Sequence, residues 1–216
     1  MILPLKSNIF WYSSRPRSLS VIRRPINFIY LDKRDRQILS LLEINPEMSQ
    51  SDIAEKLKIS QPSVSARMHK LKQKGALAYV VGMNLKKVDL YMAKVDVIAN
   101  NTSSVLDIFK DCPYFLNGLI VSGKHNLCLF FVGEDIATLE AIVDGHLRSN
   151  PLVRGAEVSI VIAPMKDLIL PIKMNFEFSS TPPCGSGCNC KDCPHHISSR
   201  CLGCPVTGSY NGKIWK

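Results

Sequence analysis

The fold of the first half of the chain is decided by residues 31–77, LDKRDRQILSLLEINPEMSQSDIAEKLKISQPSVSARMHKLKQKGAL. Apolar residues recur there at helical spacing in three separate runs. Asn45-Pro46 ends the first run, because a residue before proline avoids helical backbone angles. Ser49 and Ser60 are N-caps for the second and third runs, and Gly75 closes the third. The stretch therefore predicts three short helices, of which the last two form a helix-turn-helix.

The apolar positions of each predicted helix are expected to face a common core. They are Ile38, Leu39, Leu41 and Leu42, then Ile53 and Leu57, then Val64, Met68 and Leu71. Residues 76–82 are expected to form a wing strand, so that a winged helix-turn-helix domain spans residues 31–82. Residues 84–89 are interpreted as the linker that leaves this domain.

The third predicted helix carries the strongest functional signal, because it is basic and contains no acidic residue. In a helix-turn-helix this helix enters the major groove of DNA, with its first residues at base edges. Glutamine and arginine suit adenine and guanine edges, whereas lysines neutralise phosphates. A solvated basic face is the alternative, and the helix-turn-helix spacing favours double-stranded DNA. The residues predicted to contact DNA are Gln61, Ser63, Ser65, Arg67, Lys70, Lys72 and Lys74.

Residues 91–178 predict a second domain. Alternating or continuous apolar runs predict strands near residues 93–97, 116–122, 127–132 and 158–162. Helical spacing predicts helices at 105–109 and 136–147. The resulting order β-α-β-β-α-β is the ferredoxin-like pattern, so the chain is expected to be α+β. A further apolar stretch, Leu168–Phe178, is interpreted as an additional edge strand.

Residues 31–77 resemble the N-terminal domain of the Lrp/AsnC family of bacterial and archaeal regulators. The resemblance rests on the opening Leu31-Asp32, the core Ser60-x-x-Ser63-Val64-x-x-Arg67 and the closing Leu71-x-x-x-Gly75-x-Leu77. It implies a second, ferredoxin-like domain that forms homodimers or higher homo-oligomers and binds small effectors such as amino acids.

One turn departs from the family pattern. Family members usually have Gly-x-x-Asp between the middle strands of the second domain, whereas this chain has Gly123-Lys124-His125-Asn126. The resemblance makes Gly123 and Asn126 the expected effector residues. Replacing the carboxylate by an amide removes a charge that would interact with an amino-acid ammonium group.

Charge is spread unevenly along the chain, whose net charge is +9. Residues 1–30 carry +5 with no acid, and the composition resembles a transit peptide. We interpret them instead as a disordered basic arm, or as sequence ahead of the true start. Residues 81–178 carry −2, which suggests a DNA-facing module joined to a different one. No apolar run approaches the roughly 20 residues of a membrane span, so a cytoplasmic protein without membrane contact is expected.

Six of the eight cysteines fall in residues 184–216, and this tail contains few large apolar residues. Such a segment cannot fold on apolar burial alone. The other two, Cys112 and Cys128, lie in apolar segments and are expected to be buried thiols. Two C-x-x-C turns, each presenting two thiolates, are typical of a tetrahedral metal site. The tail is therefore interpreted as a small metal-binding module whose candidate ligands are Cys184, Cys188, Cys190, Cys193, Cys201 and Cys204.

Several kinds of metal chemistry suit this tail. Zn²⁺ is favoured, with Cys190, Cys193, Cys201 and Cys204 as the first choice of ligands. An iron–sulfur cluster is the alternative suggested by the bunched cysteines and by the prolines after Cys193 and Cys204. Cu⁺ and metal-free redox thiols remain further alternatives.

The whole pattern predicts a sequence-specific transcriptional regulator of the Lrp/AsnC type, possessing a tail that responds to metal or redox state. An enzyme of the siroheme decarboxylase type has the same two domains, but it needs charged residues around a haem-like pocket after the wing. Residues 77–82 are apolar and uncharged, and no catalytic set of residues is recognisable, so we expect no enzyme. A DNA-compacting protein of low specificity is the third hypothesis.

Overall fold

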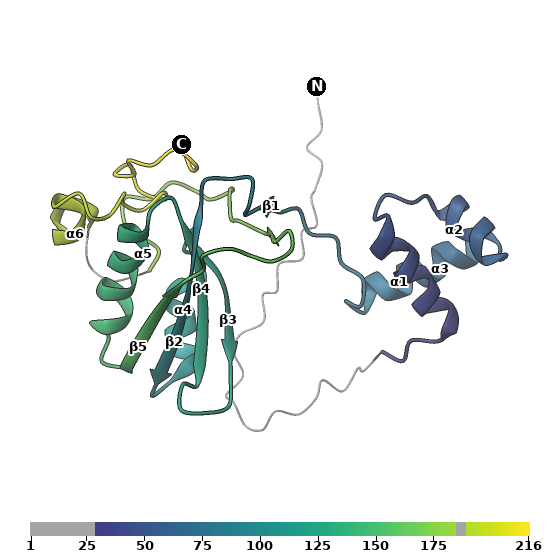
Figure 1. Cartoon of the computed structure of the whole chain (residues 1–216), viewed down its shortest axis with the longest axis horizontal. Coiled ribbons are helices and arrows are strands. Elements are labelled where there is room, and N and C mark those ends of the chain that lie inside the picture. The colour runs from purple at the N-terminus through teal and green to yellow at the C-terminus, as the bar shows by residue number, and fades with distance from the viewer. Residues whose placement is uncertain (1–28, 185–188) are drawn as a thin grey trace. The chain divides into compact units, whose positions relative to one another are not determined.

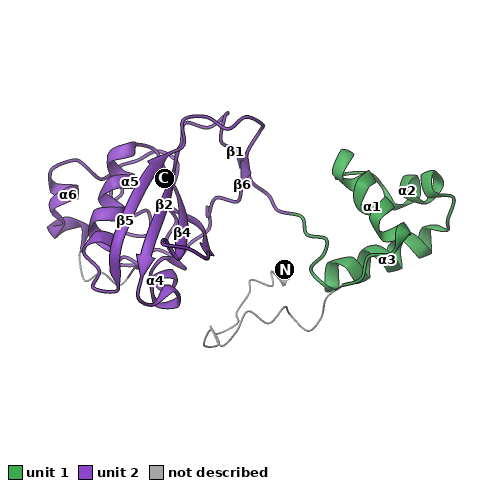
Figure 2. Ribbon diagram, turned by 60° about the horizontal axis from the view of Figure 1, so that its bottom comes forward, with its two compact units in different colours: residues 1–79 green, residues 80–216 purple. Residues whose placement is uncertain are grey.

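The computed structural model describes residues 29–184 and 189–216. The chain divides into two compact units, with the boundary between Tyr79 and Val80 (Figure 2). The basic segment 1–30 lies almost wholly outside the described residues, as does Cys188. No helix in the described part is long and apolar enough to cross a membrane.

The first unit contains the three predicted helices, α1 (Lys33–Ile44), α2 (Gln50–Leu57) and α3 (Gln61–Gln73). Asp32 caps α1 in a reciprocal capping box with Asp35. The Ser49 hydroxyl accepts a hydrogen bond from the Asp52 amide at 3.1 Å and so begins α2. Ser60 is the N-cap residue of α3 without a side-chain hydrogen bond. The helix-turn-helix expected from the sequence is confirmed.

The three helices bury one common apolar core. The predicted Leu39 does not join this core. The buried members of the core are the predicted Ile38, Leu42, Ile53, Val64 and Met68, together with Ala54, and the predicted Leu71 of α3 is buried as well. All are less than a tenth exposed. Because this core is contributed by all three helices, α3 is held in a fixed orientation on α1 and α2.

The wing strand expected at residues 76–82 is wrong. That segment has no strand structure, and Tyr79, Val80 and Val81 are exposed. A lone extended segment cannot pair its own backbone groups, and no other strand lies within residues 29–79. The first strand, β1 (Met83–Asn84), instead pairs with β6 (Ile169–Leu170) in the second unit. An edge strand was expected over residues 168–178, and the structure has only the two-residue strand β6 in that described segment.

The second unit has the predicted order of elements: β2 (Tyr91–Ala99), α4 (Thr102–Phe109), β3 (Phe115–Ile120), β4 (Leu127–Gly133), α5 (Ile136–Val143), the π-helical turn η1 (Asp144–Arg148) and β5 (Val153–Ile160). The four longer strands form an antiparallel sheet in the order β3-β4-β2-β5. This is the ferredoxin-like topology expected from the sequence.

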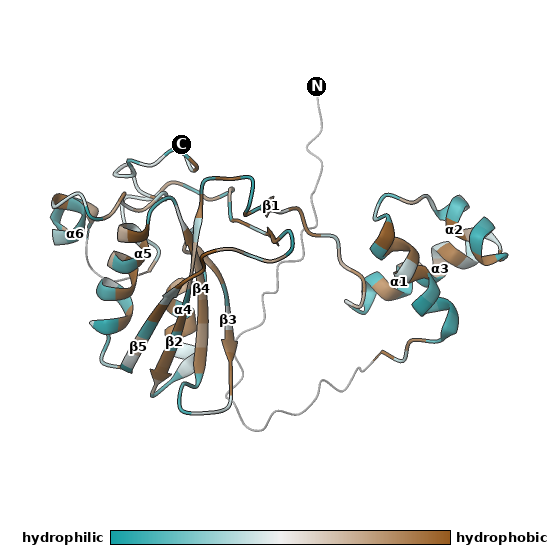
Figure 3. Cartoon of the chain, in the orientation of Figure 1, coloured by the Kyte–Doolittle hydropathy of each residue, from teal (hydrophilic) through white to brown (hydrophobic). Residues whose placement is uncertain are grey.

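The core of this unit lies between the sheet and its two helices. Figure 1 shows helices α4 and α5 beside the sheet. Val95 and Val97 of β2 are fully buried and share one core with Phe109 of α4 and Leu139 of α5. Apolar residues dominate the central strands, as Figure 3 shows by colour. Cys112 and Cys128 are buried, as expected.

The tail is part of the second unit. It contains the short helices η2 (Cys190–Asp192) and α6 (Pro194–Ile197). Trp215, only 5% exposed, joins the main core and packs edge-on against Tyr114. Its indole nitrogen donates to the Lys173 carbonyl at 2.9 Å. The end of the chain therefore closes over the domain.

A carboxylate at the end of β4 holds the same segment from the other side. Glu134 accepts hydrogen bonds from the amides of Lys213 and Ile214, and from the Tyr210 hydroxyl. The Leu202 amide donates to the Thr138 hydroxyl on α5 at 2.9 Å. Several independent contacts thus fix the tail against β4 and α5.

Replacing Trp215 by alanine tests this docking. We expect Trp215→Ala to lower the free energy of unfolding by about 3–5 kcal/mol, the usual cost of removing a large buried aromatic side chain. Phe178→Ala is the matched control, because Phe178 is 79% exposed, and its change should stay below about 1 kcal/mol. Chemical denaturation measures both variants. Equal stability of the two would show that the chain end does not belong to the core.

Candidate nucleic-acid interface and thiol-lined cavity

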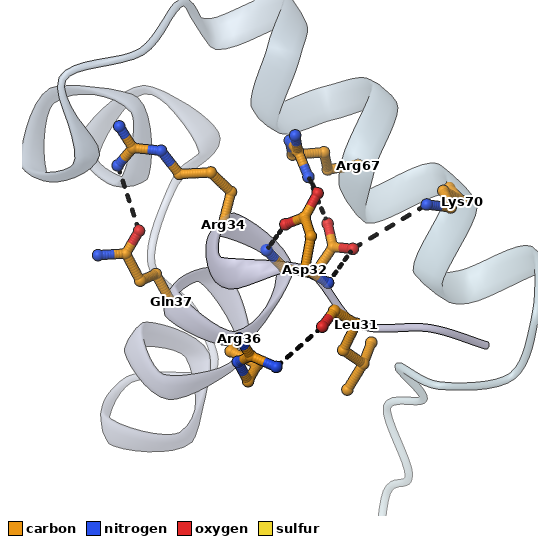
Figure 4. Close-up of polar contacts among 8 residues, drawn as sticks. Leu31, Asp32, Arg34, Arg36, Gln37, Arg67 and Lys70 are labelled. Carbon is orange, nitrogen blue, oxygen red and sulfur yellow. Dashed lines mark hydrogen bonds and ion pairs between the residues drawn. The ribbon is translucent and has the colours of Figure 1, made fainter.

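An ion-pair network joins α1 to α3 in the first unit (Figure 4). The Asp35 carboxylate is fully buried and lies 2.7 Å from the Arg67 guanidinium. The same Arg67 nitrogen lies 2.6 Å from Asp32, and the Lys70 ammonium lies 4.0 Å from Asp35. The hydrogen bond from Arg67 lowers the pKa of Asp32 from its ordinary value of 3.8 to about 2. The Asp32 carboxylate is therefore ionised at neutral pH, and both carboxylates are paired with Arg67.

This network gives Arg67 a structural role that the sequence analysis missed. The guanidinium supplies the counter-charge for a buried carboxylate, and its side chain is 30% exposed. The signal was present as two acids three residues apart at the start of α1, but the spacing alone does not say which base they meet. The role of Arg67 as a reader of DNA bases stays a prediction.

The other residues predicted to contact DNA lie along α3. Gln61, Lys70, Lys72 and Lys74 are exposed, whereas Ser63 and Ser65 are half-buried. The Gln61 amide donates to Gln50 of α2 at 2.9 Å. The Lys72 ammonium lies 4.9 Å from the centre of the Tyr79 ring. The face of α3 left open to solvent also includes Pro62, Ala66, His69 and Gln73.

In the turn expected to hold the effector residues, the side-chain amide of Asn126 binds the backbone. The Asn126 side chain accepts a hydrogen bond from the Ala99 amide and donates one to the Ala99 carbonyl, both at 2.8 Å. A carboxylate could only accept, which explains why an asparagine fits this position. Gly123 has a φ of +134°, which favours glycine. The predicted effector role of both residues remains a prediction.

A cavity of about 320 Å³ lies between the tail and the body of the second unit. The tail contributes five of the predicted cysteine ligands, and the body contributes Cys112, Tyr114 and His146 among others. The cysteines of the tail that line it are Cys184, Cys190, Cys193, Cys201 and Cys204. The structure thus brings these five predicted residues to one place.

Backbone amides in the tail donate hydrogen bonds to two of the cysteine sulfur atoms. The Gly203 amide donates to Cys201 Sγ, and the Cys204 amide donates to Cys190 Sγ, both at 3.4 Å. The Thr207 hydroxyl lies 3.8 Å from the same Cys190 sulfur. Gly203 has a φ of +90°, and a side chain there would meet the Ser209 carbonyl oxygen. This turn therefore requires glycine and presents donors to two sulfurs.

Burial raises the pKa of three thiols that line this cavity, Cys112, Cys201 and Cys204. The pKa values of Cys201 and Cys204 rise to about 11, mainly through burial and also through neighbouring sulfurs. The neighbours of Cys204 are Cys190 and Cys184, and those of Cys201 are Cys190 and Cys193. Burial likewise raises the pKa of Cys112 to about 12. Cys190 is thus a neighbour of both Cys201 and Cys204.

The ligand atoms surround the cavity without converging on one point. Across residues 29–184 and 189–216, no three Cys, His, Asp or Glu side chains are close enough to hold one metal ion. The Cys184 Sγ atom lies 3.6 Å from His146 Nε2. His195 also lines the cavity, whereas His196 Nδ1 lies 2.9 Å from the Cys201 carbonyl oxygen. His146 was missed by the sequence analysis, because nothing in an amphipathic helix marks it as facing the tail.

Comparison with known proteins covers both units. Residues 31–77 match the family of winged helix-turn-helix DNA-binding domains. An HTH-type transcriptional regulator of Pyrococcus horikoshii is 26% identical over 138 residues, which cover 59% of this chain and 85% of the relative. The regulator LrpA of the same organism is 25% identical, with 63% and 99% covered. These relatives are transcriptional regulators and not enzymes.

Several solved structures have a similar fold. Escherichia coli AsnC matches with a TM-score of 0.55 at 16% identity, covering 64% of this chain and 96% of that one. A Neisseria meningitidis regulator solved in complex with L-Met matches with a TM-score of 0.56 at 22% identity, covering 68% and 98%. The shared part is the two-domain Lrp/AsnC fold, and about a third of this chain lies outside the match.

The ion-pair network predicts that Arg67 matters for stability. Arg67→Ala leaves the buried Asp35 carboxylate without its nearest partner, so we expect the first unit to lose about 1–3 kcal/mol of stability. Lys72→Ala serves as the control, because Lys72 is exposed and far less engaged. Thermal unfolding followed by circular dichroism measures both. A melting temperature unchanged by Arg67→Ala would contradict the structural role of this arginine.

Proposed function

We propose that the chain is a sequence-specific DNA-binding transcriptional regulator of the Lrp/AsnC type, which responds to metal or redox state through its cysteine tail. The observation that carries the DNA-binding part is the basic, exposed face of α3 within a matched helix-turn-helix domain. The observation that supports the sensing part is the cavity lined by five tail cysteines.

The interface with DNA is built on α3. Gln61 lies at the start of this helix, where a recognition helix reaches base edges. Lys70, Lys72 and Lys74 lie in its second half and at its C-cap, where they would meet phosphates. The ion pair between Arg67 and Asp35 fixes α3 on α1, so these side chains would approach DNA from a rigid support.

Several copies of the chain are expected to act together. β3 is an edge strand, and its Leu119 and Ile120 are each about half exposed. An exposed apolar edge favours pairing with a second copy. A homodimer or higher homo-oligomer would place two or more α3 helices on successive turns of DNA, as symmetric operators require.

A metal ion is the cofactor that this cavity would hold. Buried thiols resist ionisation, and a cation offsets that cost because it stabilises the thiolate. Zn²⁺ is favoured, because a site of thiolates and imidazole suits it, and an iron–sulfur cluster or Cu⁺ are the alternatives. A small-molecule effector in the ferredoxin-like domain is a separate proposal, motivated by the L-Met complex of the Neisseria relative.

Binding to DNA is tested by the salt dependence of affinity. Replacing Lys70, Lys72 and Lys74 together by alanine should reduce the slope of log affinity against log salt by about 0.9 per lost phosphate contact. Footprinting on genomic fragments should show protection of a few short sites. Continuous protection of every fragment would instead identify a DNA-compacting protein, and a slope unaltered by the triple substitution would exclude these lysines from the interface.

Metal content is tested by anaerobic purification, elemental analysis and a visible absorption spectrum. We expect a colourless protein with zinc bound to the tail, and loss of that zinc in a variant in which Cys190 and Cys204 are serine. A Cys128→Ser variant is the control, because Cys128 is buried in the sheet away from the cavity. A brown protein with iron and acid-labile sulfide would favour a cluster, and absence of any metal would contradict a metal-sensing tail.

A further inference from the structure

We propose that His146, on the π-helical turn after α5, is a ligand of the tail's metal centre, together with Cys184, Cys190 and Cys204. The inference rests on the proposed metal-binding function and adds a ligand from the body of the ferredoxin-like domain. It differs from a site made only by the two C-x-x-C turns, in which Cys193 and Cys201 take the places of His146 and Cys184.

The separation of the first two ligands fits a shared metal ion. Zinc bonds to cysteine sulfur at about 2.3 Å and to histidine nitrogen at about 2.0–2.1 Å, with tetrahedral angles. Two such ligands on one ion therefore stand about 3.6 Å apart. Cys184 Sγ and His146 Nε2 lie 3.6 Å apart. This pair already has the spacing that a tetrahedral ion requires.

The surroundings of His146 also point to a ligand. Its Nδ1 atom is buried and has no hydrogen-bond partner among the described residues. This atom is not the one that faces Cys184, so among the described residues the ring makes its polar contact through Nε2. Ligation through Nε2 would supply a favourable interaction that offsets this burial. The ring is held in place by an edge-on contact with Phe109, 6.2 Å between centres.

The local backbone directs this histidine to the cavity. α5 ends at Val143 and continues as the π-helical turn Asp144–Arg148. A π-turn carries one extra residue per turn, and such turns are frequent at functional sites. Asp144, Gly145 and His146 all line the cavity. The unusual helical geometry therefore coincides with the residue that faces the thiols.

Cys190 and Cys204 complete the set because they line the same cavity as Cys184 and His146. The Cys204 amide donates to Cys190 Sγ at 3.4 Å, so the two residues are in contact. The Thr207 hydroxyl faces the same sulfur. Hydrogen bonds to a coordinating sulfur stabilise its thiolate form. A four-coordinate site of three thiolates and one imidazole between the tail and α5 would require these side chains to draw together around the ion, since no three of them lie within reach of one ion in the structure as described for residues 29–184 and 189–216.

Such a site would couple metal occupancy to the second domain. The tail is anchored at Glu134 and Trp215, whereas Cys184 lies at its beginning. A bond from the ion to His146 would fasten that beginning to the end of α5. Metal binding would thereby stabilise η1 and α5, which belong to the ferredoxin-like unit.

X-ray absorption at the zinc edge tests this ligand set on the zinc-loaded full chain. We expect three sulfur neighbours at about 2.3 Å and one nitrogen at about 2.0–2.1 Å. Zinc affinity, measured by competition with a chromophoric chelator, should fall at least 10–100-fold in His146→Ala, since even outer partners of ligands cost this much. His146→Cys should recover affinity and give four sulfur neighbours.

His195→Ala is the matched control, because His195 lines the same cavity and is not one of the proposed ligands. Its zinc affinity should stay within about twofold of the original. Four sulfur neighbours in the unaltered chain, or full affinity in His146→Ala, would overturn the inference while leaving the metal-binding function standing. Absence of zinc from the unaltered chain would overturn that function itself. The absorption measurement on the unaltered chain does not depend on how any variant folds.

Discussion

The docking of the chain's last residues on the ferredoxin-like domain is the constraint on which the cavity depends. Glu134 binds two backbone amides of the terminal segment, and Trp215 fills part of the domain core. A segment of this composition has too little apolar surface to fold alone, so it takes its order from the body. The cavity exists because the segment is fixed at its end and must return past α5. The cysteine thiols consequently lie between the tail and the body of the ferredoxin-like domain. In the part that the structure describes, the tail does not form a separate metal-binding module.

A second constraint governs the DNA-facing unit. Asp35 is fully buried and paired with Arg67, which links the beginning of α1 to the middle of α3. An uncompensated carboxylate at that position would be costly, so the pair enforces one arrangement of the two helices. Lys72 and Lys74 lie beyond this network and are exposed, so they are available to bind phosphates. On helix α3, the residue that holds the domain together and the lysines proposed to bind DNA therefore lie at different positions.

Much of the fold was predictable from the sequence, because apolar spacing and capping residues are local signals. The three helices of the first unit and the β-α-β-β-α-β order of the second were anticipated in this way. The strand at residues 76–82 was not borne out, since apolar residues alone do not supply a pairing partner. Side-chain contacts between residues distant in sequence were not predicted. They are the contacts of Arg67 with Asp35, of Asn126 with Ala99, and of His146 with Cys184. The cysteines were recognised by their spacing, whereas the body's share of their cavity emerged only from the fold.

The account joins DNA binding to the state of the tail, and affinity for DNA with and without metal tests that link most directly. The same preparation of the full chain would be titrated with a selected operator fragment and a scrambled fragment, before and after zinc is removed by a chelator. The account predicts tighter binding to the operator, with an operator affinity that changes at least about fivefold when zinc is removed. Unchanged operator affinity across complete zinc removal would contradict it, and would leave the tail as a purely structural element.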